Sequence, residues 1–333
     1  MKIHGMCIVK NEADVLKECL TSALHWCDHI YVFDNGSSDG TWELVQEFAN
    51  REPQIVPYKQ EDGLFSGALR ADIFNAFRSN ATLQDWWCRL DADEFYIDDP
   101  RIFLSKVPSH FQTAWSASLN YYFTDRDALA YQRNPVEFLA TPVQQRLRYY
   151  LNNWGELRFF RHHDEIIWTR SEDYGGFPGE MHTAPAYPVR IWVKHYQYRS
   201  PEQIERRLFT RRAAMEASTG FLHEVTPNWS ETVATKRDVT PDFEGAQPAF
   251  AGTRWQERVV SAASLDYDAF NRRYVVNENL MPRFPVRLPL ASRVKRVIPE
   301  PIRAQLGRLR RQLFRPVDTK RKREENCSTN RAH

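Results

Sequence analysis

Three carboxylates follow directly after a short apolar run in this 333-residue chain. The run covers residues 86–90, and the acids are Asp91, Asp93 and Glu94. On a continuing strand, Asp91 and Asp93 would point to one face and Glu94 to the other. Carboxylate oxygens suit Mg²⁺ or Mn²⁺, and a divalent cation relieves the repulsion between neighbouring carboxylates. The spacing predicts a metal site that could hold a diphosphate; the alternative is an acidic surface loop after a core strand.

The composition is that of an ordinary globular protein of one large or two small domains, with 42% hydrophobic residues. A formal net charge of +2 gives no global charge signature for nucleic acid, so we expect no nucleic-acid partner. The five cysteines form no C-x-x-C pair and lie mostly in apolar segments, which is typical of reduced thiols in a cytosolic protein. No apolar run is long enough to span a bilayer, and early charged residues leave no secretory signal visible, so we expect a cytoplasmic location.

The elements that position the acids are visible in the first hundred residues. Helix-like spacing of apolar residues separates four β-rich runs, which are residues 2–9, 30–33, 55–58 and 86–90. This order predicts a parallel, right-handed α/β sheet with a ligand site beyond the carboxyl ends of its strands. The loops after the first, second and fourth runs should therefore share one edge. Their polar residues lie at 11–12, 34–39 and 91–94.

Three motifs, in this order, resemble family 2 and related glycosyltransferases of the GT-A fold. They are Ile8–Glu12, Ile30–Thr41 and Arg89–Phe95, which read IVKNE, IYVFDNGSSDGT and RLDADEF. The resemblance covers residues 1–100. It implies a GT-A (Rossmann-like) α/β fold, with a mixed, mostly parallel sheet flanked by helices and a C-terminal helical extension. It also implies transfer of a sugar, with inversion by analogy, from a nucleoside-diphosphate donor to a hydroxyl acceptor such as a glycan or a lipid-linked precursor.

The same resemblance implies roles for five residues at the donor. Asn11 and Glu12 match a segment that lines the nucleotide pocket, and Asp34 matches the carboxylate that faces the base. Asp39 matches the second acid of the turn, and Arg70 matches a basic residue beside the diphosphate. Turn and helix-cap chemistry is the alternative for the asparagine and the aspartates, because both residue types favour it. A solvated helix face is the alternative for Arg70.

By resemblance, the D-x-D motif holds the metal, Mn²⁺ or Mg²⁺, and through it the donor diphosphate. Asp91 and Asp93 are then metal ligands, and Asp91 also lies at the nucleotide sugar. Related GT-A enzymes often take a further ligand from a histidine near the end of the domain. His195, after the strand-like run 191–194, is in such a place, and His182 is a second candidate. A satisfied structural histidine is the alternative.

A carboxylate base must reach the acceptor hydroxyl in an inverting transfer. The acidic pair at residues 172–173 resembles the one that supplies this base in the family, and Asp173 is our first candidate. Glu180 is the second, because the glycines at 175, 176 and 179 would let the loop carry either acid into the cleft. An acidic surface loop is the alternative for the whole segment.

Two further segments are basic. A capping box with Pro201 starts a helix that runs to about residue 218 and displays Arg206, Arg207, Arg211 and Arg212. These arginines predict a solvated face, and the alternative is contact with a diphosphate or an anionic acceptor. Near the C-terminus, the apolar residues of a basic helical pattern share one face. This suits a helix that lies on an anionic membrane surface or docks on the catalytic domain.

We expect four regions along the chain. These are a GT-A catalytic domain at 1–220, with a nucleotide-sugar half at 1–100 and an acceptor half at 101–220, a variable loop or helical region at 221–290, a basic amphipathic helix at 291–316 and a disordered tail at 317–333. Two other functions stay open: a sugar-phosphate nucleotidyltransferase, and a non-catalytic module that binds sugar or a membrane surface. The former usually has a glycine-rich loop after its first strand, whereas the loop at 10–13 has no glycine. A phosphotransferase would carry its D-x-D motif on the first strand.

Overall fold

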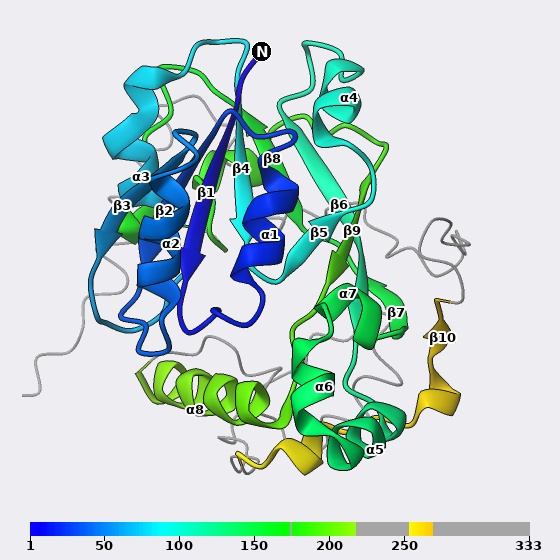
Figure 1. Ribbon diagram of the computed structural model, residues 1–333. Helices are drawn as coiled ribbons and strands as arrows, with labels where there is room; N and C mark the ends of the chain where they lie inside the picture. Colours follow the sequence, from blue (N-terminus) through cyan, green and yellow to red (C-terminus); the bar gives the residue numbers. More distant parts are fainter. Residues whose placement is uncertain (174, 218–252, 269–333) are drawn as a thin grey trace, which may run out of the picture. The chain divides into compact units, whose positions relative to one another are not determined.

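The computed structural model describes residues 1–173, 175–217 and 253–268, and a mixed β-sheet runs through them (Figure 1). Its first four strands are β1 (Ile3–Val9), β2 (His29–Asp34), β3 (Ile55–Gln60) and β4 (Trp86–Asp91). They are mutually parallel and lie in the order β4-β1-β2-β3. β1 is buried along its whole length, as expected of a central strand that is covered on both faces.

Helices connect these strands and cover both faces of the sheet. They are α1 (Leu16–Ala23), α2 (Thr41–Ala49) and α3 (Leu69–Phe77). α1 and α2 pack on the face that carries Cys7 and Val9 of β1, whereas α3 packs on the opposite face with Met6 and Ile8. The alternation of side chains along β1 therefore supplies two cores, one on each side of the sheet.

The later strands extend the sheet beyond β4 and pair mainly antiparallel. They are β5 (Glu94–Tyr96), β6 (Thr113–Tyr121), β7 (Tyr149–Trp154), β8 (Leu157–Arg161), β9 (Ile191–His195) and β10 (Asp266–Tyr267). β8 pairs with β4 and β6, and β9 runs parallel to β6 and antiparallel to β5. Around them lie α4 (Pro100–Ser105), α5 (Asp125–Arg133), α6 (Pro135–Ala140), α7 (Val143–Arg146) and α8 (Pro201–Ala217). α8 lies at the end of the sheet to which the parallel strands point (Figure 1).

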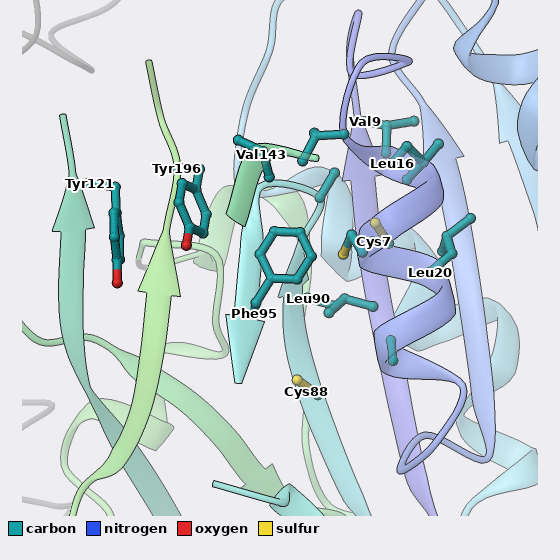
Figure 2. Close-up of a cluster of buried hydrophobic side chains, with 14 of the residues drawn as sticks. Cys7, Val9, Leu16, Leu20, Cys88, Leu90, Phe95, Tyr121, Val143 and Tyr196 are labelled. Carbon is teal, nitrogen blue, oxygen red and sulfur yellow. The ribbon is translucent and has the colours of Figure 1, made fainter. Parts of the chain in front are cut away.

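One apolar core joins the two parts of the sheet. Figure 2 shows Phe95 of β5 between α1 and β1 on one side and Tyr121 and Tyr196 on the other. The rings of Phe95 and Tyr196 meet edge to face at a centroid distance of 5.6 Å, and Tyr196 stacks on Tyr121 at 4.4 Å. Because Phe95 directly follows the acids at 91–94, this packing ties the acidic turn to the core.

The predicted α/β fold, a mixed sheet flanked by helices, is confirmed. The helix expected after residue 200 is α8, which is described as far as Ala217. Within the region expected to be a variable loop or helix, residues 253–268 pack beside β7 and the start of α5: Val260 bridges to Thr124, and β10 pairs with β7. The expected basic helix at 291–316 and the tail at 317–333 lie outside the described residues. None of the helices in the described part is long and apolar enough to cross a membrane.

His4 on β1 makes the fold sensitive to acid. Its ring is fully buried between the rings of His29 and Trp87, at centroid distances of 5.4 and 4.8 Å. Burial and then the charge of His29 lower the pKa of His4 from 6.5 to about 4, although Asp85 and Asp28 oppose that shift. Above the upper value, the ring is neutral in the folded and the unfolded chain. Between the two values, the unfolded chain binds the proton more readily, so the free energy of unfolding should fall as the pH falls.

Because the unfolded chain binds a proton at His4 more readily, the free energy of unfolding should fall by about 3 kcal/mol between pH 6.5 and about 4. Below that range His4 should cause no further loss. Urea unfolding at a series of pH values from neutrality downwards would measure it. His4→Phe keeps a ring in the stack and removes the titrating group, so its stability should depend less on pH across this window. An unchanged pH dependence in His4→Phe would contradict the assignment.

Candidate active site

The acidic turn after β4 is held at three points. Ile8 of β1 lies opposite Asp91 in the parallel pairing, and Glu94 at the start of β5 pairs with His195 of β9. The Cys19 thiol of α1 donates to the main-chain oxygens of Asp91, at 3.5 Å, and Glu94, at 3.8 Å. The sheet therefore brings His195 beside the acids at the carboxyl end of β4, which is the edge where a ligand site is expected.

Asp91 lies among three guanidinium groups. Arg70 of α3 donates to Oδ1, while Arg89 Nε and Arg158 Nη1 donate to Oδ2 at 3.0 and 2.8 Å. The side chains of Arg70 and Arg158 are each only 1% exposed. Burial raises the pKa of the Asp91 carboxyl, but Arg89, Arg70 and Arg158 outweigh burial and hold that pKa well below its usual range. Asp91 is therefore ionised, and both of its oxygens accept from arginine.

Arg158 of β8 connects Asp91 to Glu94. Its guanidinium also pairs with Glu94 and, at 3.0 Å, with Glu156, which Arg89 approaches at 3.0 Å as well. Glu94 is 2% exposed, and burial raises the pKa of its carboxyl against the opposing charge of Arg158. Glu94 and Asp91 thus share the guanidinium of Arg158. The expectation of opposite faces on one continuing strand does not apply, because β4 ends at Asp91 and β5 begins at Glu94.

Asp93 faces a second set of cations. His195 Nε2, Arg207 Nη1 and Arg199 Nη1 lie 3.5, 3.4 and 3.7 Å from its Oδ2. Burial raises the pKa of Asp93, but His195, followed by Arg207 and Arg199, lowers it well below its usual range. His195 Nδ1 lies 2.9 Å from Asn120 Oδ1, which fixes the imidazole ring. Burial lowers the pKa of His195, but Asp93 outweighs burial and raises that pKa, so Nε2 faces the carboxylate as an N–H group and would offer its lone pair to a metal only after losing this proton.

The pair Asp93–His195 could supply two ligands to a divalent cation. A carboxylate combined with an imidazole whose other nitrogen is hydrogen-bonded is a donor set common in metal sites. The structure brings these two predicted ligands together, but it turns the predicted ligand Asp91 towards arginines. Among the described residues, no three His, Cys, Asp or Glu side chains gather into a group that could bind a metal. The geometry therefore offers two protein ligands.

Asn11 and Asp39 tie the loop after β1 to the loop after β2. Asn11, which has a left-handed φ of 57°, accepts at Oδ1 from the main-chain N–H of Ser38 at 2.8 Å. Asp39 accepts from the main-chain N–H groups of Thr41, at 3.1 Å, and Ala13, at 3.3 Å. In this structure Asp39 forms a local turn bond to Thr41, and both side chains join the two loops; neither caps α2, whose N-cap residue is Gly40.

Asp34, at the end of β2, keeps one carboxylate oxygen unused. The side chain is fully buried, and its Oδ1 accepts from the N–H groups of Gly36, at 3.0 Å, and Ser37, at 2.8 Å. Its Oδ2 has no hydrogen-bond partner among the described residues. Glu12, by contrast, is paired with the fully buried Arg199. A buried carboxylate oxygen without a partner is costly, so Asp34 is suited to accept a hydrogen bond from a ligand.

A glycine-containing loop passes over the arginines around Asp91. Arg89 Nη1 donates to the main-chain oxygen of Gly175 at 3.3 Å. A Cβ on Gly176 would lie 3.3 Å from Arg70 Nη1. Both glycines have a positive φ, of 64° and 88°, so a side chain at either position would be strained. The glycines therefore allow the close approach of this loop to the cluster.

The two candidate bases differ in their surroundings. Asp173 lies at the start of this loop and accepts from Trp168 Nε1, at 3.1 Å, and from the Gly176 N–H, at 2.9 Å. Glu180 lies in the 3₁₀ turn Gly179–His182, and its side chain is exposed. The loop that approaches the Asp91 cluster is thus the one that Asp173 organises.

The buried arginines are the site residues that the sequence analysis missed. Arg158 and Arg199 are 1% and 0% exposed, and each pairs with more than one carboxylate. A charged side chain inside a buried apolar strand has to be paired. The run LRFFR at residues 157–161 therefore indicates that Arg158 is paired with acidic side chains. Arg199 follows β9 in a polar segment, where no comparable pattern identifies it.

One protein-family model matches the first half of the chain. Residues 7–162, which reach from β1 to just beyond β8, match the family model described as Glycosyl transferase family 2. No curated protein matches the chain.

Three solved structures match part of the chain, at low sequence identity and low TM-score. A mannosyltransferase from Pyrobaculum calidifontis, in complex with GDP-Man and Mn²⁺, is 15% identical with a TM-score of 0.37, over 65% of this chain and 64% of that one. S. aureus TarS 1-349 is 11% identical with a TM-score of 0.33, over 64% of each chain. GalNAc-T7 with UDP, GalNAc and Mn²⁺ is 11% identical with a TM-score of 0.34, over 64% of this chain and 48% of that one. The chain thus spans less than two thirds of the length of these structures.

Proposed function

We propose that the protein, whose residues 7–162 match the model described as Glycosyl transferase family 2, is a glycosyltransferase that moves a sugar from a nucleoside-diphosphate donor to a hydroxyl acceptor. The proposed acceptor is a glycan or a lipid-linked precursor, and the proposed transfer proceeds with inversion. The observation that carries this proposal is the pair Asp93–His195 at the carboxyl end of β4, beside buried arginines. Mn²⁺ or Mg²⁺ bound there would neutralise negative charge on the departing diphosphate.

We assign different tasks to the two aspartates of the D-x-D motif. Asp93 and His195 hold the cation, and Asn120 orients the imidazole. Asp91 would have to give up a guanidinium to join them, so we assign it to the positioning of Arg70 and Arg158. Arg70 then lies where the resemblance expects a basic residue beside the diphosphate. This division explains why the two carboxylates face different cations.

The base of the donor nucleotide is assigned to Asp34. Its Oδ2 is buried and has no hydrogen-bond partner in the described part of the chain, whereas its Oδ1 is already held by the turn. An N–H group on a nucleobase would satisfy that oxygen. Asn11 and Asp39 support this assignment by joining the loops after β1 and β2 on either side of Asp34, and Glu12 pairs with Arg199.

A thermal-shift panel tests the donor and the metal together. UDP, GDP, dTDP and CMP would each be added with and without Mn²⁺, and the melting temperature measured. We expect one nucleoside diphosphate to stabilise the protein, and to do so only when Mn²⁺ is present, because a ligand that binds only the folded state raises the free energy of unfolding, and more so the tighter it binds. Equal shifts with and without Mn²⁺ would contradict a role for the cation, and no shift with any nucleotide would contradict the donor site.

The catalytic base is predicted to be Asp173. Asp173→Asn should lower kcat by about 10²–10⁴-fold, because the acceptor hydroxyl then loses its general base, while the KM for the donor changes little. Glu180→Gln is the matched control, since this exposed acid should leave kcat within about twofold of wild type. Steady-state rates of nucleoside diphosphate release would measure both. If Glu180→Gln lowered kcat strongly and Asp173→Asn kept the wild-type kcat, the prediction would be wrong and Glu180 would be the catalytic base.

A further inference from the structure

α8 turns one of its arginines towards the acidic turn. Ile204 and Leu208 are fully buried in the core, which sets the rotation of the helix. With that rotation, Arg207 faces inwards: its side chain is 11% exposed, and its Nη1 lies 3.4 Å from Asp93 Oδ2. The neighbouring Arg206 is exposed to solvent. Two adjacent arginines of one helix therefore have different environments.

The next helical turn repeats this difference. Arg211, four residues after Arg207, lies over the Phe65 ring at 4.7 Å from its centroid, in the loop before α3. Arg212 forms an exposed ion pair within α8. The solvated face expected for this helix is thus correct for Arg206 and Arg212, whereas Arg207 and Arg211 lie along the edge of the site.

The three cations at Asp93 are held in different ways. Arg199 is bound more closely by Glu12 and by Asp14, at 2.9 Å, than by Asp93, at 3.7 Å. His195 is fixed through its Nδ1 and is one of the two ligands that fit a metal. Arg207 reaches Asp93 from α8 on a long side chain, and its guanidinium also lies over the Tyr198 ring, 5.9 Å from the ring centroid. The rotatable bonds of this side chain let the guanidinium change its carboxylate partner while the helix stays in place.

We propose that Arg207 is the counter-ion of Asp93 in the donor-free enzyme, and that it exchanges this carboxylate for the donor diphosphate when a divalent cation binds. Arg207 Nη1 and a metal would compete for the same oxygen, Asp93 Oδ2, and two cations at one buried oxygen repel each other. The displaced guanidinium stays within reach of the phosphates that the cation carries, and guanidinium binds phosphate well. This inference rests on the proposed function of the site.

Binding measurements without turnover test this exchange. Free Mn²⁺ would be counted by electron paramagnetic resonance during titration, and UDP and GDP would be titrated by calorimetry at saturating Mn²⁺. Arg207→Met should bind Mn²⁺ alone about tenfold more tightly than wild type, because a competing charge is gone. The same variant should bind the preferred nucleoside diphosphate about tenfold more weakly.

Matched variants separate the charge of Arg207 from its packing. Arg206→Met removes an exposed arginine from the adjacent position, and Arg207→Lys keeps the charge, so both should keep the wild-type Mn²⁺ affinity within about twofold. Arg207→Gln replaces the methionine variant if that variant does not fold. Affinities of Arg207→Met within about twofold of wild type would overturn the exchange but leave the proposed function intact. Failure of the wild-type protein to bind Mn²⁺ would overturn both.

Discussion

Asp93→Asn is expected to lower kcat/KM for sugar transfer by about 10²–10³-fold, which is the cost of losing one preorganised electrostatic contact at the reacting group. The amide is neutral and a poorer metal ligand than the carboxylate that now faces His195 at 3.5 Å. Initial rates of nucleoside diphosphate release, measured over a range of Mn²⁺ concentrations, would give both the loss and the shift in metal requirement.

Asp164→Asn is the control for this substitution, because the Asp164 side chain is 87% exposed and lies away from the acidic turn. It should leave the rate and the Mn²⁺ dependence unchanged. Full activity of Asp93→Asn, with unaltered dependence on Mn²⁺ and Mg²⁺, would show that this carboxylate does not hold the cation.

Arg158→Met is expected to be the most destabilising substitution in the site. It leaves Asp91, Glu94 and Glu156 without the guanidinium that they share, and Glu94 is buried. Breaking a buried ion pair by removing one partner costs about 3–5 kcal/mol. For a domain of this size, the corresponding fall in Tm is roughly 10 °C, and thermal unfolding followed by circular dichroism would measure it.

A double-mutant cycle shows whether the loss comes from stranded charge. Glu94→Gln in the Arg158→Met background removes one of the unpaired carboxylates. The double variant should therefore lose less free energy of unfolding than the two single variants lose together, by about 1 kcal/mol or more. Strict additivity, or a Tm of Arg158→Met within about 2 °C of wild type, would mean that Arg158 does not hold the cluster together.

The fold of the first hundred residues could be predicted because its elements are local. Apolar runs at 2–9 and 30–33 became the buried strands β1 and β2, and the helical spacing between them became α1. The second half could be predicted only in outline. β9 lies between β5 and β6, and the pairing of Glu94 with His195 joins segments that are remote in sequence. No local pattern specifies such a pairing.

The acids of the site could be predicted, whereas their partners could not. Asp91 and Asp93 can be identified from the sequence by their place after an apolar strand, and their spacing predicts that both face one cation. In the structure, Asp91 is held by Arg70, Arg89 and Arg158, while Asp93 faces His195. The side chain that a carboxylate meets depends on strand order and helix rotation, which the spacing of the acids does not contain. The proposed difference between the two aspartates is therefore a product of the fold.

We propose that the acidic turn after β4 binds a divalent cation and the diphosphate of a sugar donor during transfer. The most direct test of this role is the release of nucleoside diphosphate from a panel of nucleotide sugars, incubated with the wild-type protein in Mn²⁺, in Mg²⁺ and in EDTA. We expect one donor to be turned over when a divalent cation is present, and EDTA to abolish the reaction. Release from no donor, or release at the same rate in EDTA, would contradict it.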